Sequence, residues 1–312
     1  MEQLTTSAPE GFSVVGLPRT ASLDEMVREF KDAHFLIVAF GASVPDEAYR
    51  VCKHLKLVQS DIGGYSHLPV PLLRELGIPA AHNVSRKSTA IVAEHAVTLM
   101  LCVLRRIVPS VVAMRQGKWK WDLDYNQYAR MYQKTVGIVG LGKIGGLVGR
   151  MTSSFGTQVI FCDTAKIPLA TAMLIPGRQV TFEELLRTAD IVSLHVPRDT
   201  RGLIGRRELE LMKPTAILIN TSKGPVVDEA ALIEALQNQR IAGAGLDVFE
   251  QEPVDLSNPL LHMEQVVCTP HIAGAARENL SLWVSQSWEN IEAVLRGESP
   301  AGLVDTPDIL VS

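Results

Sequence analysis

The chain has 312 residues, of which 46% are hydrophobic and 21% are charged. This length exceeds that of one typical domain and is enough for two substantial cores. The net charge of -4, with both signs interspersed, excludes the basic patch of a nucleic-acid-binding protein and a like-charged, disordered interaction tail.

Short alternating elements make up the first part of the sequence. A helix is expected over Leu23–Asp32, with Ser22 as its N-cap. Three apolar runs have the length and composition of strands: Phe35–Phe40, Lys56–Ser60 and Ile78–Asn83. Because helical segments lie between these runs, the pattern predicts a parallel sheet covered by helices.

A long apolar stretch follows, from Thr89 to Val108. Its length is that of a membrane span, but it carries one glutamate, one histidine and two arginines, and the rest of the chain has no comparable segment. We therefore predict one long helix, buried within the protein or between subunits. The connector after it, Gly117–Gln133, is rich in Trp and Tyr and has no clear periodicity.

The N-terminal residues and the spacing of the cysteines indicate in which cellular compartment the protein is expected. The N-terminus has no basic start followed by an apolar run, so a secretory signal is not expected. The four cysteines lie far apart and have no metal-binding spacing, which favours small core residues in a reducing compartment. We therefore expect a cytoplasmic protein that has no metal site and does not bind membranes.

A second β/α series begins at Thr135. Its expected strands are Thr135–Gly140, Gln158–Cys162, Asp190–Leu194, Ala216–Asn220, Gly243–Phe249 and Gln265–Thr269. Helices are expected over Lys143–Phe155, Phe182–Thr188, Arg206–Met212, Asp228–Asn238 and, near the end of the chain, Ala276–Arg296. Six strands with crossovers are the number expected of the two mononucleotide-binding halves of a Rossmann fold.

A glycine-rich turn joins the first strand of this series to its helix. Residues 140–145 read GLGKIG, the G-x-G-x-x-G pattern of dinucleotide-binding proteins. Gly140 would allow the tight turn, Gly142 would let the backbone approach a pyrophosphate, and Gly145 would let the helix pack on the strand. The N-terminus of the helix would then offer free N–H groups and the positive end of its dipole to the phosphates.

The acidic residue expected of such a site is Asp163, 18 positions after Gly145. It stands at the end of the next strand, where a carboxylate can accept hydrogen bonds from the adenosine ribose and repel a 2′-phosphate. This favours NAD over NADP, although the nearby Lys166 leaves NADP as an alternative. The pattern predicts an NAD-binding domain.

Three later strands end in reactive side chains. Because ligands bind beyond the carboxyl ends of parallel strands, Lys223, Asp247 with Glu252, and His271 are expected to converge beside the nicotinamide. These residue types suit hydride exchange with a 2-hydroxy acid. His271 would exchange the proton, Glu252 would fix its tautomer, and Lys223 would hold the substrate carboxylate and polarise its carbonyl. Each residue alone also has a structural interpretation, and only their joint placement favours catalysis.

Over nearly its whole length the sequence resembles the D-isomer-specific 2-hydroxyacid dehydrogenases. The segments that carry the resemblance are Val92–His95, Thr135–Gly145, Ser193–Ile204, Leu211–Leu232, Gly243–Pro253 and Thr269–Ala275. The resemblance implies an α/β protein in which an NAD-binding domain, residues 84–274, is inserted into a discontinuous flavodoxin-like substrate domain, residues 1–83 and 275–312. It also implies hinges near Asn83 and Gly274, and a homodimer formed through the nucleotide domains.

The resemblance assigns roles to individual positions. His271 matches the family's acid/base histidine, Glu252 its partner glutamate, and Asp247 the aspartate near the nicotinamide carboxamide. Further positions are implied beside the cofactor: Lys143, Ile144, His195, Pro197, Thr200, Thr221, Ser222, His271 and Gly274. The backbone N–H groups of Gly63, Gly64 and Tyr65 are implied to meet the substrate carboxylate.

Two positions depart from the family pattern. Lys223 stands where the family ordinarily has a catalytic arginine, and lysine cannot make the planar, bidentate carboxylate contact of a guanidinium. The acidic residue usual after the paired glycines is also absent, since Ser66 and then Pro69 occur there. Both changes fall in the expected substrate pocket, which points to an atypical substrate or weak activity on ordinary 2-keto acids.

The sequence therefore predicts an NAD-dependent D-2-hydroxyacid dehydrogenase, an oxidoreductase that acts on a small 2-keto or 2-hydroxy acid. Two alternatives stay open. The lysine at position 223 admits a dehydrogenase of another small anion, such as phosphite or formate. A non-catalytic NAD sensor of the corepressor type would keep the same cofactor motif, but intact His271 and Glu252 argue against it.

Overall fold

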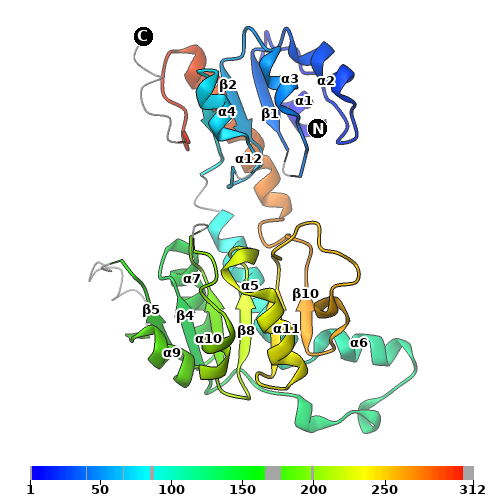
Figure 1. The fold of residues 1–312 in the computed structure, drawn as a ribbon, viewed down its shortest axis with the longest axis vertical. Coiled ribbons are helices and arrows are strands. Elements are labelled where there is room, and N and C mark those ends of the chain that lie inside the picture. Colours follow the sequence, from blue (N-terminus) through cyan, green and yellow to red (C-terminus); the bar gives the residue numbers. More distant parts are fainter. Residues whose placement is uncertain are drawn as a thin grey trace. The chain divides into compact units, whose positions relative to one another are not determined.

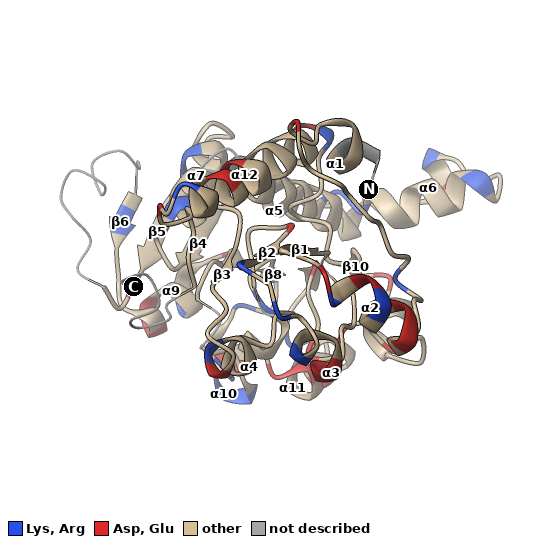
Figure 2. Cartoon of the chain, turned by 90° about the horizontal axis from the view of Figure 1, so that it is seen from above, with Lys and Arg blue, Asp and Glu red and all other residues tan. Residues whose placement is uncertain are grey.

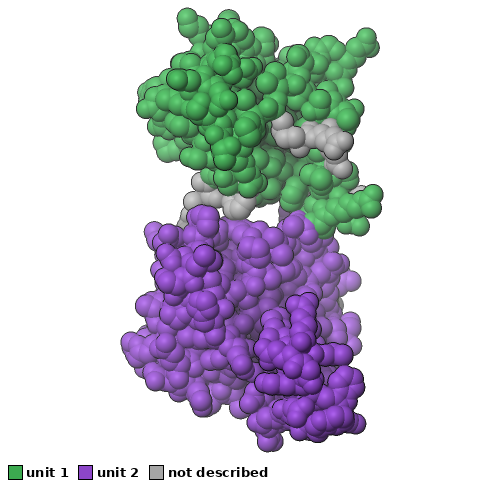
Figure 3. Space-filling model, turned by 90° about the vertical axis from the view of Figure 1, so that its right-hand side faces the viewer, with its two compact units in different colours: residues 1–88, 276–312 green, residues 89–275 purple. Residues whose placement is uncertain are grey.

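The computed structural model describes residues 2–39, 41–65, 67–84, 88–165, 177–197 and 200–304. The chain divides into two compact units, which Figure 3 colours separately: residues 1–88 with 276–312 form unit 1, and residues 89–275 form unit 2. The sequence predicts these boundaries at residues 83/84 and 274/275. Phe40, Ser66 and Lys166 lie outside the described residues.

Unit 1 is built on three parallel strands in the order β1-β2-β3, of which Figure 1 labels β1 and β2. Their bounds are Phe35–Val38, Leu57–Ser60 and Ala80–Ala81. The helices of this unit are α1 (Glu2–Thr6), α2 (Leu23–Phe30), α3 (Asp46–Arg50), α4 (Val70–Glu75) and α12 (Arg277–Leu295). Ser22 is the N-cap of α2, as the sequence predicts, and it forms a capping box with Glu25.

Helices cover both faces of this small sheet. On one face, α3 and α4 pack Tyr49 and Leu72 against Val58. On the other face, α12 packs Trp288 against the sheet residue Leu57. Unit 1 therefore combines chain segments from both ends of the sequence around one parallel sheet.

Unit 2 contains a parallel sheet of seven strands in the order β10-β9-β8-β7-β4-β5-β6. The strands are β4 (Thr135–Val139), β5 (Gln158–Cys162), β6 (Gly177–Gln179), β7 (Ile191–Leu194), β8 (Ile217–Asn220), β9 (Gly243–Leu246) and β10 (Val266–Cys268). Six of them match the predicted strands, which confirms the Rossmann-type architecture.

β6 is not among the predicted strands, so the predicted number of six strands was wrong. All three residues of β6 are exposed, so no apolar pattern marks it. With β6 included, the first six strands of this unit have the order 3-2-1-4-5-6, and β10 adds a seventh strand beside β9.

Helices pack on both faces of the seven-stranded sheet. One face is covered by α5 (Ser88–Leu104) and α7 (Lys143–Ser153). The other is covered by α9 (Phe182–Thr188), α10 (Arg206–Leu211) and α11 (Glu229–Gln237). Short 3-10 helices occur at η1 (Lys120–Asp122), η2 (Tyr125–Gln127), η3 (Gly224–Val226) and η4 (Pro259–His262).

The prediction of a single helix over Thr89–Val108 was wrong. α5 ends at Leu104, Arg106 has a φ of +46°, and α6 (Ile107–Arg115) continues at 58° to α5. Arg106 donates a hydrogen bond to Glu264 at 2.8 Å, which holds the bend through a residue far away in the sequence. Among the described residues no single helix could cross a membrane by length and composition, and only the bent α5–α6 pair meets that test.

The two helices differ in their surroundings. α5 lies in the core through residues such as Ala93, Ala96 and Met100. No residue of α6 is buried, and Arg115 in its last turn is basic. Figures 1 and 2 show this helix reaching away from the sheet.

Candidate active site

The turn after β4 requires glycine at two positions. Gly140 has a φ of +90°, and a Cβ there would clash with the backbone oxygen of His195. A Cβ at Gly145 would clash with the backbone oxygen of Gly140, so the first turn of α7 packs directly on the glycine turn. At Gly142, the N-cap of α7, a Cβ would meet no described atom within 4 Å. The helix N-terminus is thus open to an anionic group, as pyrophosphate binding requires.

Asp163 stabilises the same turn. Its Oδ2 accepts a hydrogen bond from the backbone N–H of Leu141 at 2.7 Å, and its Oδ1 accepts one from Ala165 at 2.8 Å. A carboxylate has about four acceptor positions, so ribose hydroxyl groups can be bound in addition. The position of Asp163 beside the glycine turn therefore fits the role that the sequence predicts.

The loop after β8 is ordered by a buried asparagine. Asn220 accepts hydrogen bonds from the N–H and hydroxyl of Ser222 at 3.0 and 2.7 Å, and it donates one to the backbone oxygen of Lys223 at 2.9 Å. The hydroxyl oxygen of Thr221 is buried and has no hydrogen-bond partner among the described residues. An orphaned polar atom at a strand end fits a contact with a bound cofactor.

His195 follows β7 and lies beside the glycine turn. Its backbone N–H donates to Val139 at 2.8 Å, and its Nε2 lies 2.9 Å from the hydroxyl of Ser193. Burial lowers the pKa of His195 to about 4, so its ring is neutral at pH 7. Pro197 is exposed, and the N–H of Thr200 donates to its backbone oxygen at 3.3 Å.

The clearest catalytic geometry joins His271 to Glu252. Nδ1 of His271 lies 2.6 Å from Oε2 of Glu252, and the two side chains are 27% and 30% exposed. The other carboxylate oxygen of Glu252 accepts the backbone N–H of Phe249 at 3.1 Å. Burial raises the pKa of Glu252, but these hydrogen bonds and the charges of His271 and Lys223 outweigh it and lower the pKa below its usual value.

This arrangement defines the state of the imidazole. Because an ionised carboxylate only accepts hydrogen bonds, Nδ1 of His271 carries a proton. The carboxylate then holds the ring and stabilises the imidazolium form, while Nε2 is the nitrogen that can exchange a proton with a substrate. Such a pair can act as a general acid or as a general base.

Asp247 is fully buried, and its carboxylate binds the chain around His271. It accepts hydrogen bonds from the hydroxyl of Thr269 at 2.6 Å and from the N–H groups of Ile272 and Ala273, each at 2.8 Å. These contacts anchor the His271 loop, a role of Asp247 that the sequence does not predict. A direct contact of Asp247 with the nicotinamide stays a prediction.

Lys223 lies at the start of η3, between the ordered turn of Asn220 and the loop of Glu252. The next residue, Gly224, packs so closely on the backbone of Phe249 that a Cβ would clash there. Two strand-end loops therefore touch at this glycine. This contact explains how the charge of Lys223 comes to act on Glu252.

The predicted substrate loop belongs to unit 1. The hydroxyl of Ser60 donates to the backbone oxygen of Gly64, and the half-exposed ring of Tyr65 packs on His82 with 5.3 Å between centroids. A Cβ at Gly63 would lie 3.4 Å from the backbone oxygen of Asn83. The structure thus describes an ordered loop, and its role toward a substrate stays a prediction.

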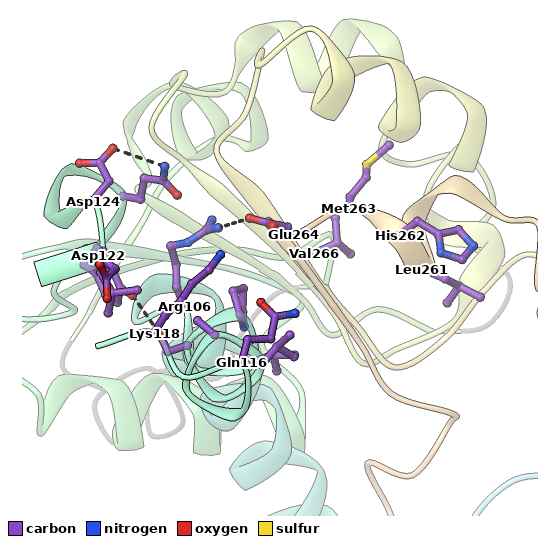
Figure 4. A pocket seen from close by; sticks show the side chains of 18 residues that line it. Arg106, Gln116, Lys118, Asp122, Asp124, Leu261, His262, Met263, Glu264 and Val266 are labelled. Atoms are coloured by element: carbon purple, nitrogen blue, oxygen red, sulfur yellow. Dashed lines mark hydrogen bonds and ion pairs between the residues drawn. The ribbon is translucent and has the colours of Figure 1, made fainter. Parts of the chain in front are cut away.

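A cavity of about 460 Å³ lies elsewhere in unit 2 (Figure 4). It is enclosed by α6, the connector after it and the segment from η4 to β10, and the Arg106–Glu264 ion pair crosses it. None of the predicted catalytic or cofactor residues lines this cavity. Within the described ranges no three His, Cys, Asp or Glu side chains are grouped so that they could hold a metal ion.

Comparison with known proteins identifies the family. Residues 97–273 match the D-isomer specific 2-hydroxyacid dehydrogenase, NAD binding domain. The chain belongs to this family. A glyoxylate reductase from Thermofilum pendens is 38% identical, with 91% of this chain and 85% of that relative covered.

Solved structures of D-lactate dehydrogenase and of a glyoxylate/hydroxypyruvate reductase are also similar to this chain. A D-lactate dehydrogenase from Aquifex aeolicus, solved with NAD and lactic acid, is 27% identical with a TM-score of 0.75, and 87% of this chain and 86% of that one are covered. An NADPH-dependent glyoxylate/hydroxypyruvate reductase from Sinorhizobium meliloti is also 27% identical, with a TM-score of 0.81 and coverages of 92% and 90%.

The resemblance noted in the sequence is thereby confirmed. As a member of the D-2-hydroxyacid dehydrogenase family, the protein is an NAD-dependent oxidoreductase that interconverts hydroxy and keto acids. Its NAD-binding domain is the Rossmann-type unit that carries the glycine turn. The comparisons favour this enzyme over a non-catalytic NAD sensor.

Proposed function

We propose that the enzyme reduces a small 2-keto acid of the glyoxylate type with NADH, using His271 and Glu252 as its acid–base pair. The observation that carries this proposal is the 2.6 Å contact between Nδ1 of His271 and Glu252. The names of relatives such as the Thermofilum pendens glyoxylate reductase support the substrate class.

The chain's own residues would perform the proton chemistry. When bound, NADH supplies the hydride that adds to the carbonyl carbon of the keto acid. His271, as the imidazolium, gives its Nε2 proton to the carbonyl oxygen as the C=O double bond becomes a C–O single bond. Glu252 keeps the Nδ1 proton in place throughout and stabilises the charged ring. In the oxidising direction neutral His271 takes the hydroxyl proton back.

Lys223 would supply the positive charge for the substrate. It would hold the substrate carboxylate and polarise the carbonyl, in the position where the family has arginine. A lysine makes this contact as a point charge without the bidentate geometry of arginine. We therefore expect weaker discrimination among small anions than an arginine would give.

The cofactor would be held at the carboxyl end of the sheet. The N-terminus of α7 at Gly142 would face the pyrophosphate, and Asp163 would face the adenosine ribose. Thr221, Ser222 and His195 would line the nicotinamide side. The carboxylate of Asp163 supports NADH over NADPH, because a 2′-phosphate there would meet a negative charge.

A substrate panel tests the proposed function. The purified enzyme is assayed with glyoxylate, hydroxypyruvate and pyruvate, each with NADH and with NADPH, and with phosphite and formate in the presence of NAD. Turnover of the keto acids with NADH is the expected result. Turnover of phosphite or formate without turnover of any keto acid would overturn the proposal.

We also infer that the enzyme is a homodimer in which a second copy covers α6. The helix is apolar all round, and its exposed side chains include Val111, Val112 and Met114, the last of which is 62% exposed. The connector adds Trp121 and Tyr125, which are 75% and 65% exposed. Exposed apolar side chains gathered on one helix and the connector after it are typical of a protein–protein interface, and a two-fold dimer pairs such a surface with its own copy.

A further inference from the structure

The acid–base residue has an unusual backbone conformation. His271 has a φ of +54°, in the left-handed region that residues other than glycine adopt uncommonly. Such a conformation costs free energy and persists only where surrounding contacts enforce it. The loop around His271 must therefore be held by specific interactions.

Asp247 supplies these interactions on both sides of His271. Its carboxylate accepts the hydroxyl of Thr269 before the histidine and the N–H groups of Ile272 and Ala273 after it. The backbone oxygen of Asp247 also accepts the N–H of His271 itself at 2.9 Å. One fully buried residue thus holds the loop at four points.

A histidine on α5 completes this cluster from another part of the fold. Nε2 of His95 lies 3.0 Å from the hydroxyl oxygen of Thr269 and 3.5 Å from Oδ1 of Asp247. The single hydroxyl proton of Thr269 points to the carboxylate at 2.6 Å, so the hydroxyl oxygen accepts from His95. His95 therefore carries its proton on Nε2 and donates it into the Thr269–Asp247 contact.

The helix that carries His95, α5, is held in place by core packing. Its neighbours Ala93 and Ala96 are fully buried in the core beneath the sheet, so α5 cannot shift without disturbing the packing. The side chain of His95 is 18% exposed, and it lies 174 residues before Thr269 in the sequence. The donor therefore reaches the loop from a fixed element outside it.

We propose that His95 is a positioning residue for catalysis, which acts through Thr269 and Asp247 to hold His271 in its active geometry. This inference rests on the proposed role of His271. Loss of the His95 donor would remove one of the two side chains that contact the Thr269 hydroxyl and leave only the carboxylate of Asp247 there. Displacement of a catalytic group by about 1 Å can lower the rate by about 100-fold, while binding of a cofactor at other residues is unaffected.

Two substitutions separate positioning from packing. His95→Leu removes the donor and keeps much of the side-chain volume, whereas His95→Gln keeps an amide N–H near the position of Nε2. Thr98→Ala is the matched control, because Thr98 lies one turn further along α5, is exposed, and donates only to the backbone of its own helix. Each variant is measured for kcat, for the KM of NADH, and for amide hydrogen exchange of residues 269–275.

We expect His95→Leu to speed amide exchange in residues 269–275 and to lower kcat by about 10-fold or more, with the KM of NADH changed less than about twofold. His95→Gln should keep both the amide exchange of residues 269–275 and kcat near their wild-type values, and Thr98→Ala should change neither. Unchanged exchange in His95→Leu would overturn the proposal, and so would faster exchange with an unchanged kcat. Equal damage by His95→Gln and His95→Leu would also overturn it, since that would indicate a packing role.

The exchange measurement keeps the two proposals distinguishable. If the wild-type enzyme turned over no keto acid, the proposed function would fail. The exchange of residues 269–275 would then decide by itself whether His95 holds the loop.

Discussion

Nδ1 of His271 lies 2.6 Å from Oε2 of Glu252, although the two residues are 19 positions apart and stand on different loops. The contact is short, as expected of a hydrogen bond between a charged acceptor and an N–H donor. It orients the imidazole, and Nε2 is the nitrogen that we propose exchanges the proton. The chemistry that we propose depends on this one relationship more than on any other.

Removal of either partner should slow turnover without loss of the cofactor. His271→Ala should lower kcat by at least about 100-fold, the usual contribution of a general acid–base residue. Glu252→Gln should lower it by about 10- to 100-fold, because a neutral amide does not stabilise the imidazolium. NADH binding, followed by its fluorescence, should persist in both. Glu250→Gln, an exposed neighbour, serves as control, and wild-type turnover in His271→Ala would contradict the mechanism.

Changes at Lys223 should affect the substrate and not the cofactor. Lys223→Met should raise the KM for glyoxylate by about 10-fold or more, because it removes the charge that we assign to the carboxylate. Lys223→Arg should lower that KM, since a guanidinium binds a carboxylate bidentately. Steady-state kinetics at saturating NADH measure both. A KM for glyoxylate that is insensitive to Lys223→Met would place the substrate cation elsewhere.

Cofactor preference should depend on Asp163. Asp163→Asn keeps a carbonyl oxygen that can accept the N–H of Leu141 at 2.7 Å, but it removes the negative charge. We expect the ratio of kcat/KM for NADH over NADPH to fall by about 10-fold, because a 2′-phosphate no longer meets a carboxylate. The ratio is measured with one keto acid at a fixed concentration. An unchanged ratio would show that other residues determine the preference.

The dimer inference is tested by a charge on α6. Val111 is 44% exposed on this helix, so Val111→Asp should not disturb the core of the subunit. It should, however, place an uncompensated charge in an apolar interface and shift the protein to a monomer. Light scattering after size exclusion measures the mass, and circular dichroism verifies the fold. A monomeric wild type, or a Val111→Asp variant that stays dimeric, would exclude α6 as the interface.

Burial of His195 predicts a pH dependence of stability. Its pKa falls from 6.5 to about 4 in the folded protein, so unfolding takes up a proton between these values. The contribution of neutral His195 is therefore present above pH 6.5 and is lost as the pH falls toward 4. In urea unfolding without cofactor, His195→Gln should lessen the decrease in unfolding free energy over this range. The same decrease in wild type and variant would contradict the assignment.

Local patterns in the sequence were sufficient for much of the fold. The helix start at Ser22 has the predicted side-chain cap. Gly140 and Gly145 could be placed because a tight turn that packs against its own helix excludes any side chain, which is a constraint within a few residues. The family could be recognised for the same reason, since its motifs are short and occur in order.

Tertiary structure alone decided the remaining features. β6 is exposed and pairs with β5 without an apolar pattern, and α5 ends where Arg106 meets Glu264, 158 residues away. The contact of His95 with Thr269, and the four hydrogen bonds that Asp247 accepts around His271, likewise join distant segments. A sequence shows which side chains are available at strand ends, because burial and turns are local. Which of them hold the others in place depends on packing between segments far apart in the chain.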